Sequence, residues 1–288
     1  MDLYDQMMNL DRRWVYLVIG LVVTITAILP FKVPLYITPE VRSVYNFIES
    51  LEPDDVLMIG VDYAPEVMAE LHPMSYAITR QCFSRDIKLL LCCLHQNGPG
   101  MVEQVIAQVS KEYDKVNGED YVYLGYKPYP GITILAMGQN FRIPFPEDYY
   151  GTTLDSLPMM KKLTNFDDIK AIINISGGSG TEYWINYANG RYNAKLAIGV
   201  TGVMTSDYYP FLQSGQIFGL IGGMKGAAEY EDLAEKGGYI SREKDQLWAF
   251  KSMPIQTTTH IVVILFIVLG NVGYFMSKRK KYGKYEHP

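Results

Sequence analysis

The chain has 288 residues, of which 48% are hydrophobic and 20% are charged, and this length is enough for one globular core of full size plus some membrane sequence. The formal net charge of −5 is unevenly spread, because residues 278–288 hold five of the 26 basic side chains and one of the 31 acidic ones. Residues 1–13 hold two basic and three acidic side chains, so 19 basic and 27 acidic residues remain between the tails. A segment this acidic repels phosphates, which argues against a nucleic-acid partner.

The first apolar run covers residues 14–31, which carry no charged side chain and begin with Trp14 and Tyr16. Aromatic residues of this kind mark a membrane interface, and the run is near the lower limit for crossing a hydrocarbon layer of about 30 Å. A cleaved signal peptide is the alternative, but the run is long for one and no small-x-small cleavage site follows it. We therefore expect a retained transmembrane helix at 14–31, preceded by a cytoplasmic tail at 1–13.

The second apolar run covers residues 255–277, and a basic tail at 278–288 follows it at once. Five positive charges within eight residues are typical of the cytoplasmic side of a membrane. Two spans then place both termini in the cytoplasm and residues 32–254 outside it. The odd count of three cysteines is a mild objection, since oxidising compartments usually pair them, although burial would protect them.

Three residues of the second run, Gly270, Asn271 and Gly273, suit contact with another membrane helix. Small residues allow helices to approach closely, and a polar amide in hydrocarbon seeks a hydrogen-bond partner. The alternative is local variation without a role. We expect the lipid bilayer, and either other membrane subunits or further copies of this chain, as partners.

The segment between the spans alternates short apolar runs with helical periodicity. A lead-in helix should begin at Pro39 with Thr38 as its N-cap. The expected strands cover residues 56–61, 89–94, 121–126, 169–175, 196–200 and 217–221. The expected helices cover residues 65–80, 101–113, 181–188, 208–213 and 227–235.

Apolar strands that are each followed by a helix predict a mainly parallel sheet with helices on both faces. The expected fold class is therefore α/β, doubly wound and Rossmann-like, flanked by two single transmembrane helices. Residues 128–164 contain five prolines and many aromatic residues, and we expect them to be irregular, to cross one edge of the sheet and to contact partners.

Ligands of such sheets bind at the carboxyl ends of the strands, so polar residues that follow strands are candidates for a binding site. The candidates follow four expected strands and are Asp62, Ser176, Gly177, Gly178, Ser179, Thr181, Glu182, Thr205, Ser206, Asp207 and Lys225. The glycine-rich stretch Ser176–Glu182 offers backbone N–H groups to an anion. It lacks the Walker A lysine and matches neither GxGxxG nor GxSxG, and a tight turn with Ser179 or Thr181 as a helix N-cap is the favoured alternative.

The other candidates also have structural alternatives. Asp62 suits a metal ligand or general base, but aspartate also caps helices. Thr205–Asp207 precede an expected helix, and capping of that helix explains them equally. Lys225 suits an anion, whereas Glu229 and Glu231 are interpreted as a solvated helix face. The chain contains 23 tyrosines in total, and those that are exposed favour contact with protein or sugar.

Metal and nucleophile chemistry have weak support. The chain has no CxxC or HExxH spacing, so no metal site is predicted, and Cys82, Cys92 and Cys93 are interpreted as buried hydrophobic residues. A Ser–His–Asp triad would need His72 or His95, of which His95 follows a strand. No cofactor can be named from these residues.

Two functions remain. The first is a non-catalytic binding or scaffold subunit of a larger membrane assembly, suggested by two anchors and the lack of a catalytic motif. The second is a membrane-bound enzyme or small-ligand binder that uses the strand ends.

Overall fold

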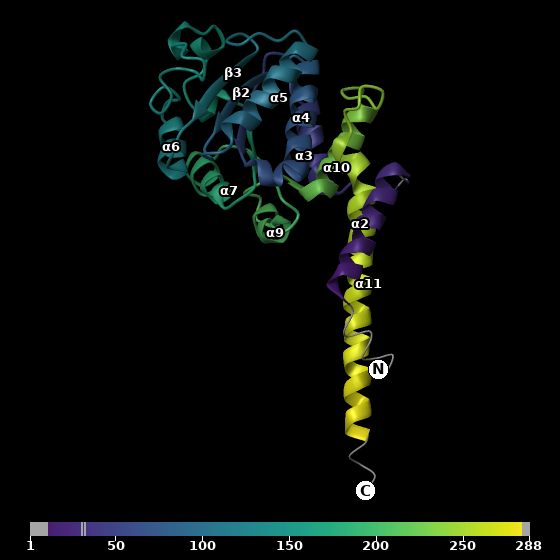
Figure 1. Ribbon diagram of the computed structural model, residues 1–288. Helices are drawn as coiled ribbons and strands as arrows, with labels where there is room; N and C mark the ends of the chain where they lie inside the picture. The colour runs from purple at the N-terminus through teal and green to yellow at the C-terminus, as the bar shows by residue number, and fades with distance from the viewer. Residues whose placement is uncertain (1–10, 30, 32, 284–288) are drawn as a thin grey trace. The chain divides into compact units, whose positions relative to one another are not determined.

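The computed structural model describes residues 11–29, 31 and 33–283, and it describes side chains as far as residue 278 (Figure 1). Most of the two predicted tails, 1–13 and 278–288, lies outside the described residues. The chain forms two compact units. One is the α/β domain, Leu35–Phe250, and the other combines Met1–Pro34 with Lys251–Pro288.

The α/β domain is built on one sheet of six parallel strands in the order β3-β2-β1-β4-β5-β6. The strands are β1 Val56–Asp62, β2 Lys88–Cys93, β3 Tyr121–Tyr126, β4 Ala171–Ser176, β5 Leu196–Val200 and β6 Gly219–Gly222. All six expected strands are present, and the predicted parallel sheet is confirmed. At its centre, Ile59 of β1 pairs with Leu91 of β2 on one side and with Ile173 of β4 on the other. The strand order therefore reverses between β1 and β4.

Helices cover both faces of the sheet (Figure 1). One face is covered by α3 Pro39–Glu49, α4 Met68–Ser84, α5 Pro99–Glu112 and α10 Gly223–Lys236, which pack against one another. The remaining helices of the domain are α6 Pro130–Met137, α7 Gly180–Tyr183, α8 Gly190–Tyr192 and α9 Thr205–Gln213. Pro39 takes the first position of α3 and Thr38 the N-cap position, as predicted, although the Thr38 side chain makes no cap bond. This layered arrangement is that of a doubly wound α/β domain.

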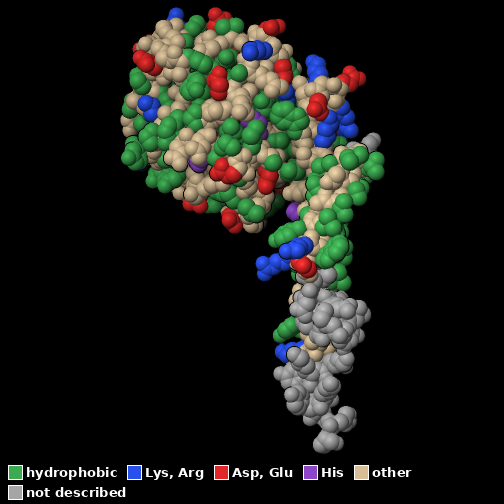
Figure 2. Space-filling view, in the orientation of Figure 1, with side chains coloured by type: hydrophobic (Ala, Val, Ile, Leu, Met, Phe, Trp, Pro, Cys, Tyr) green, Lys and Arg blue, Asp and Glu red, His purple; other side chains and the backbone are tan. Residues whose placement is uncertain are grey.

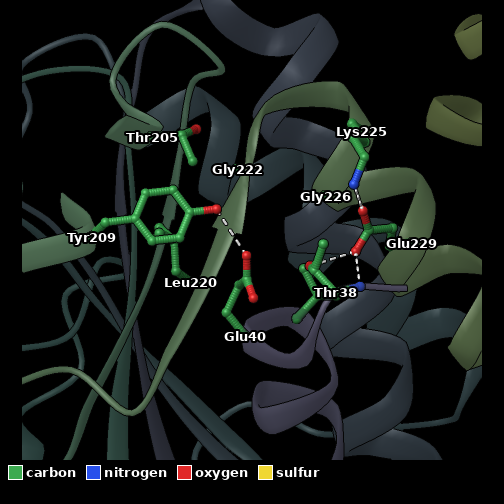
Figure 3. Close-up of a pocket in the computed structure, with 10 residues that line it drawn as sticks. Thr38, Glu40, Thr205, Tyr209, Leu220, Gly222, Lys225, Gly226 and Glu229 are labelled. Atoms are coloured by element: carbon green, nitrogen blue, oxygen red, sulfur yellow. Dashed lines mark hydrogen bonds and ion pairs between the residues drawn. The ribbon is translucent and has the colours of Figure 1, made fainter. Parts of the chain in front are cut away.

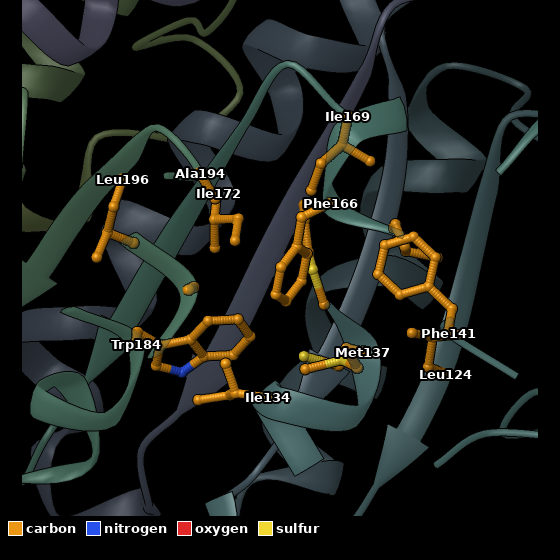
Figure 4. Close-up of a cluster of buried hydrophobic side chains, with 14 of the residues drawn as sticks. Leu124, Ile134, Met137, Phe141, Phe166, Ile169, Ile172, Trp184, Ala194 and Leu196 are labelled. Atoms are coloured by element: carbon orange, nitrogen blue, oxygen red, sulfur yellow. The ribbon is translucent and has the colours of Figure 1, made fainter. Parts of the chain in front are cut away.

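A large hydrophobic cluster joins the sheet to α6 and to the segment after β4 (Figure 4). Ile172 of β4 meets Ile134 and Met137 of α6 there, together with the rings of Phe141 and Trp184. Residues 128–164, which we expected to be irregular, therefore contain a helix and supply part of the core. That helix has only eight residues, which are too few turns to show a clear periodicity in the sequence.

The helix expected at 181–188 is irregular in its middle. A π-helical segment, Trp184–Asn189, separates α7 from α8. Such widened turns are rare and often lie at functional sites, and this one contains Trp184, whose side chain is fully buried.

The second unit contains α2 Arg12–Ile28 and most of α11 Trp248–Gly283. Among the described helices, one segment, Trp248–Lys278, is long and apolar enough to cross a membrane. The helix α2 has 17 residues and ends three residues before the expected boundary at 31. The hydroxyls of Thr26 in α2 and Thr258 in α11 share a hydrogen bond of 3.2 Å.

Candidate functional site

The carboxylate of Asp62 ends β1 at the point where the strand order reverses. In open α/β sheets the crevice at this point is the usual ligand site. Asp62 is instead 4% exposed, and its carboxylate accepts three hydrogen bonds. The donors are the backbone N–H of Leu94 at 2.6 Å, Nδ2 of Asn174 at 2.7 Å and Nε1 of Trp184 at 2.8 Å.

The network around Asp62 continues into the helix after β4. Thr181 Oγ1 donates to Oδ1 of Asn174 at 3.0 Å, so each described polar side chain of this group has a partner. Burial raises the pKa of Asp62, and its three hydrogen bonds partly oppose that shift. We conclude that side chains of the protein itself, above all the Trp184 indole, fill the crevice beside β1.

Gly60 makes room for that indole. A Cβ atom added at Gly60 would lie 3.0 Å from Cζ2 of Trp184 and 3.1 Å from Nδ2 of Asn174. Both distances are tighter than ordinary van der Waals contact. The glycine near the end of β1 is therefore explained by close packing of the strand against the tryptophan.

The glycine-rich stretch Ser176–Glu182 closes on itself. Ser176 Oγ donates to the carbonyl oxygen of Gly178 at 3.1 Å, and the Gly178 N–H returns a bond of 3.3 Å to the same hydroxyl. Ser179 takes the predicted N-cap position of α7, but its side chain makes no cap hydrogen bond. Glu182 is exposed on α7, and Gly177 packs beside Val67. Close packing against Val67 explains Gly177, whereas a Cβ added at Gly178 would meet no atom within 4 Å.

A small pocket of about 90 Å³ lies at the carboxyl end of β6 (Figure 3). The ends of β6, α3, α9 and α10 meet there. Its lining consists of Thr38, Glu40, Val41, Thr205, Tyr209, Leu220, Gly222, Lys225, Gly226 and Glu229. Two of the predicted ligand residues, Thr205 and Lys225, therefore come together in one pocket.

The charged groups of the pocket are paired with each other (Figure 3). Glu229 Oε2 accepts the N–H of Thr38 at 2.8 Å and its hydroxyl at 2.7 Å, while Oε1 pairs with Lys225. On the opposite wall, the phenol of Tyr209 donates to Glu40 at 2.9 Å. The cation that we expected to attract an anion is thus already partnered by a carboxylate.

The remaining candidates do not join this pocket. Ser206 and Asp207 are exposed on the first turn of α9, where Ser206 Oγ donates to Asp207 at 3.3 Å. Thr205, which does line the pocket, donates its hydroxyl to the carbonyl oxygen of Thr201 at 3.1 Å. Asp62 and Ser176–Glu182 are not among the residues that line the pocket. The structure thus divides the predicted site into a filled crevice and a small polar pocket.

This chain matches no family model. A search of the curated proteins found no match. The function must therefore be argued from the geometry of the site and of the surface.

The prediction that Glu229 and Glu231 form a solvated face of α10 was wrong, because each is 1% exposed. Glu231 accepts the backbone N–H of Ala249 at 3.1 Å and that of Phe250 at 2.8 Å, at the start of α11. Burial raises the pKa of Glu231 to about 7, against the lowering effect of these bonds. Residues two apart on a helix point about 200° away from each other, so the spacing alone argues against one shared solvated face.

The histidines considered for a catalytic triad make other contacts. His72 Nδ1 and the phenol of Tyr63 lie 2.8 Å apart, and the same phenol lies 2.9 Å from Ser75 Oγ. Burial lowers the pKa of His72 to about 4, although the Gln104 side chain partly offsets the shift. His95 Nδ1 accepts the N–H of Asn97 at 3.3 Å. Among the described hydrogen bonds, neither histidine contacts a serine of the glycine-rich stretch.

The three cysteines, Cys82, Cys92 and Cys93, are free and buried, as the apolar surroundings predicted. Burial raises the pKa of each thiol, which keeps it in the unreactive protonated form. In the part of the chain that the structure describes, no three His, Cys, Asp or Glu side chains gather to hold a metal ion.

Proposed function

We propose that this protein is a membrane-anchored, non-catalytic binding or scaffold subunit of a larger membrane assembly. The observation that carries the proposal is the crevice between β1 and β4, which Trp184 and Asp62 fill. A doubly wound domain that binds a nucleotide or substrate keeps this crevice open. Here its polar groups bond to one another, so the domain offers its outer surface for recognition.

The proposed arrangement has α2 and α11 as two spans, both termini in the cytoplasm and the α/β domain on the other side. Support comes from the apolar length of α11 and from the hydrogen bond between Thr26 and Thr258, which joins the two helices. Arg12 and Arg13 at the start of α2, and the basic residues from Lys278, favour the cytoplasm. Reporter fusions at each terminus and within the domain test this topology, and a cytoplasmic signal from the domain would contradict it.

Helix contact within the assembly is proposed at Gly270, Asn271 and Gly273. The Asn271 side chain donates to the carbonyl oxygen of Ile267 at 2.8 Å, and among the described hydrogen bonds its Oδ1 accepts none. Gly270 has no atom within 4 Å of the position where a Cβ would be. A neighbouring helix can therefore approach closely at this level and donate to the amide oxygen.

Purification of the full chain in mild detergent, followed by measurement of its mass, tests the proposal. We expect a particle clearly heavier than one 32.7 kDa chain after correction for detergent. Asn271→Leu should reduce the assembled fraction, whereas Asn46→Leu on α3 serves as a control outside the second span. A stable monomer that is unaffected by Asn271→Leu would count against this function.

A small-ligand binder or enzyme is the second candidate, because Thr205 and Lys225 line the same pocket. The volume of about 90 Å³ suits a ligand of only a few atoms. Inorganic phosphate is a suitable probe, since Lys225 is the cation of this pocket. Binding that disappears with Lys225→Met and persists with Lys236→Met, on the same helix, would favour this candidate over the scaffold.

A further inference from the structure

The helices α6 and α7 together expose an apolar surface, which we call the α6–α7 surface and define by Tyr129, Ile132 and Tyr183. These side chains are 74%, 71% and 42% exposed. The two helices are in direct contact, because a Cβ added at Gly131 would lie 2.9 Å from the ring of Tyr187 and 3.3 Å from that of Tyr183. The rings of Tyr183 and Tyr187 stack at 6.3 Å with an angle of 16°. The exposed residues therefore belong to one continuous patch.

The backbone of Tyr129 is the second observation. Tyr129 lies between Pro128 and Pro130 and has φ 60° and ψ 67°, a left-handed conformation that glycine or asparagine normally occupies. Its carbonyl oxygen accepts the N–H of Thr133 at 3.1 Å, and the Thr133 hydroxyl bonds to the carbonyl oxygen of Pro128 at 2.9 Å. These bonds need no aromatic side chain. Packing of the exposed ring does not explain a tyrosine at this strained position, and strained residues gather at functional sites.

The charges beside the patch are the third observation. Glu182 on α7 and Asp207 on α9 are both exposed. Burial raises the pKa of the Tyr208 phenol, and the negative charges of Glu182 and Asp207 raise it as well. In Figure 2, hydrophobic side chains gather over the region where Figure 1 places α6, and acidic side chains lie below it toward α7 and α9. The aromatic patch thus has two exposed carboxylates on α7 and α9, which we call its acidic border.

We propose that the α6–α7 surface docks a protein of the assembly that presents apolar side chains flanked by Lys or Arg. The inference rests on the proposed function as an assembly subunit, and it names the face that is used and the chemistry of the partner. Tyrosines are enriched in protein interfaces because they add large contact areas with little loss of conformational freedom. The acidic border selects a basic partner and repels an anionic lipid surface.

Photo-crosslinking in the full chain tests the proposal. A photoreactive phenylalanine analogue is placed at Tyr129, at Ile132 and, as a control, at Val116, which is 52% exposed and precedes the amino end of β3, whereas Tyr129 follows its carboxyl end. We expect the same protein to be captured from positions 129 and 132 and not from 116. The double variant Glu182→Lys, Asp207→Lys should lower the yield by about tenfold, because it reverses the charge complementarity. Capture of lipid alone, of a second copy of this chain, or of equal material from Val116 would overturn the proposal.

A second variant separates docking from folding. Tyr129→Gly removes the ring and relieves the left-handed strain, so the melting temperature should stay equal or rise while capture from position 132 falls. A fall in the melting temperature would show that the ring has a structural role and would overturn the docking role. If the full chain is a monomer, the proposed function itself fails. If it assembles but positions 129 and 132 capture no other protein, only this surface fails.

Discussion

Trp184 donates its indole N–H to the carboxylate of Asp62 across 2.8 Å, and this bond joins the segment after β4 to the end of β1. The two residues occupy the position at which a doubly wound sheet usually receives its ligand. Their burial turns a candidate binding residue into part of the core. Asp62 thus links the end of β1 to the residue after β2 and to the tryptophan.

Asp62→Ala should destabilise the domain strongly. The change leaves the Leu94 N–H, the Asn174 amide and the Trp184 indole without their acceptor, and each buried unpaired donor costs about 1–3 kcal/mol. We expect a loss of at least about 3 kcal/mol in the free energy of unfolding, since the three donors can only partly find other acceptors. Reaction of the buried cysteines with a thiol reagent reports unfolding. Asp207→Ala, at an exposed carboxylate, is the control, and equal stability of the two variants would contradict the proposed role of Asp62.

Two glycine substitutions separate packing from backbone effects. In Gly60→Ala the new methyl group meets the Trp184 ring and the Asn174 amide, and overpacking of this kind costs about 1–3 kcal/mol. Gly178→Ala adds a methyl group with nothing within 4 Å, so we expect little change. Thermal unfolding of both variants checks this, and a greater loss from Gly178→Ala would show that the glycine-rich stretch has a tighter requirement than its surroundings indicate.

His72 should make the domain sensitive to acid. Its pKa is lowered from 6.5 to about 4 by burial, so the unfolded chain binds a proton more readily than the folded one. The contribution of neutral His72 to the free energy of unfolding is complete above pH 6.5. It is lost as the pH falls toward 4, by about 2–3 kcal/mol. His72→Gln should therefore lose less stability than the wild type over this range. Circular dichroism during denaturant unfolding at several pH values gives the comparison, and parallel curves would exclude the effect.

Glu231 should act in the opposite sense. Its pKa is raised from 4.5 to about 7, so the folded chain holds the proton more tightly. The stability that it contributes is complete below pH 4.5 and is lost as the pH rises through 7, by about 3 kcal/mol. Glu231→Gln should remove this dependence, whereas Glu235→Gln, on the same helix, should keep it. The difference in stability between the wild type and Glu231→Gln should therefore change between pH 5 and pH 8. An equal difference at both pH values would refute the raised pKa of Glu231.

The amino-acid sequence alone determined the order and type of most elements. Each strand of the sheet is a short apolar run and most helices show their period within a few turns, so local burial patterns identify them without knowledge of the fold. The parallel sheet followed from that alternation. The helix α6 was missed because its eight residues show too little periodicity, and the π-helical segment was missed because it depends on where Trp184 packs.

Only the tertiary structure decided which polar residues are functional candidates and which belong to the core. Asp62 and Trp184 lie 122 positions apart, and Thr38 and Glu229 lie 191 apart, so no local pattern relates them. A hydrogen-bond partner is chosen by the packing of whole layers, whereas a strand or helix is chosen by its own residues. The sequence could therefore name the strand ends at which ligands usually bind, but burial of the tryptophan determined that the central one is filled.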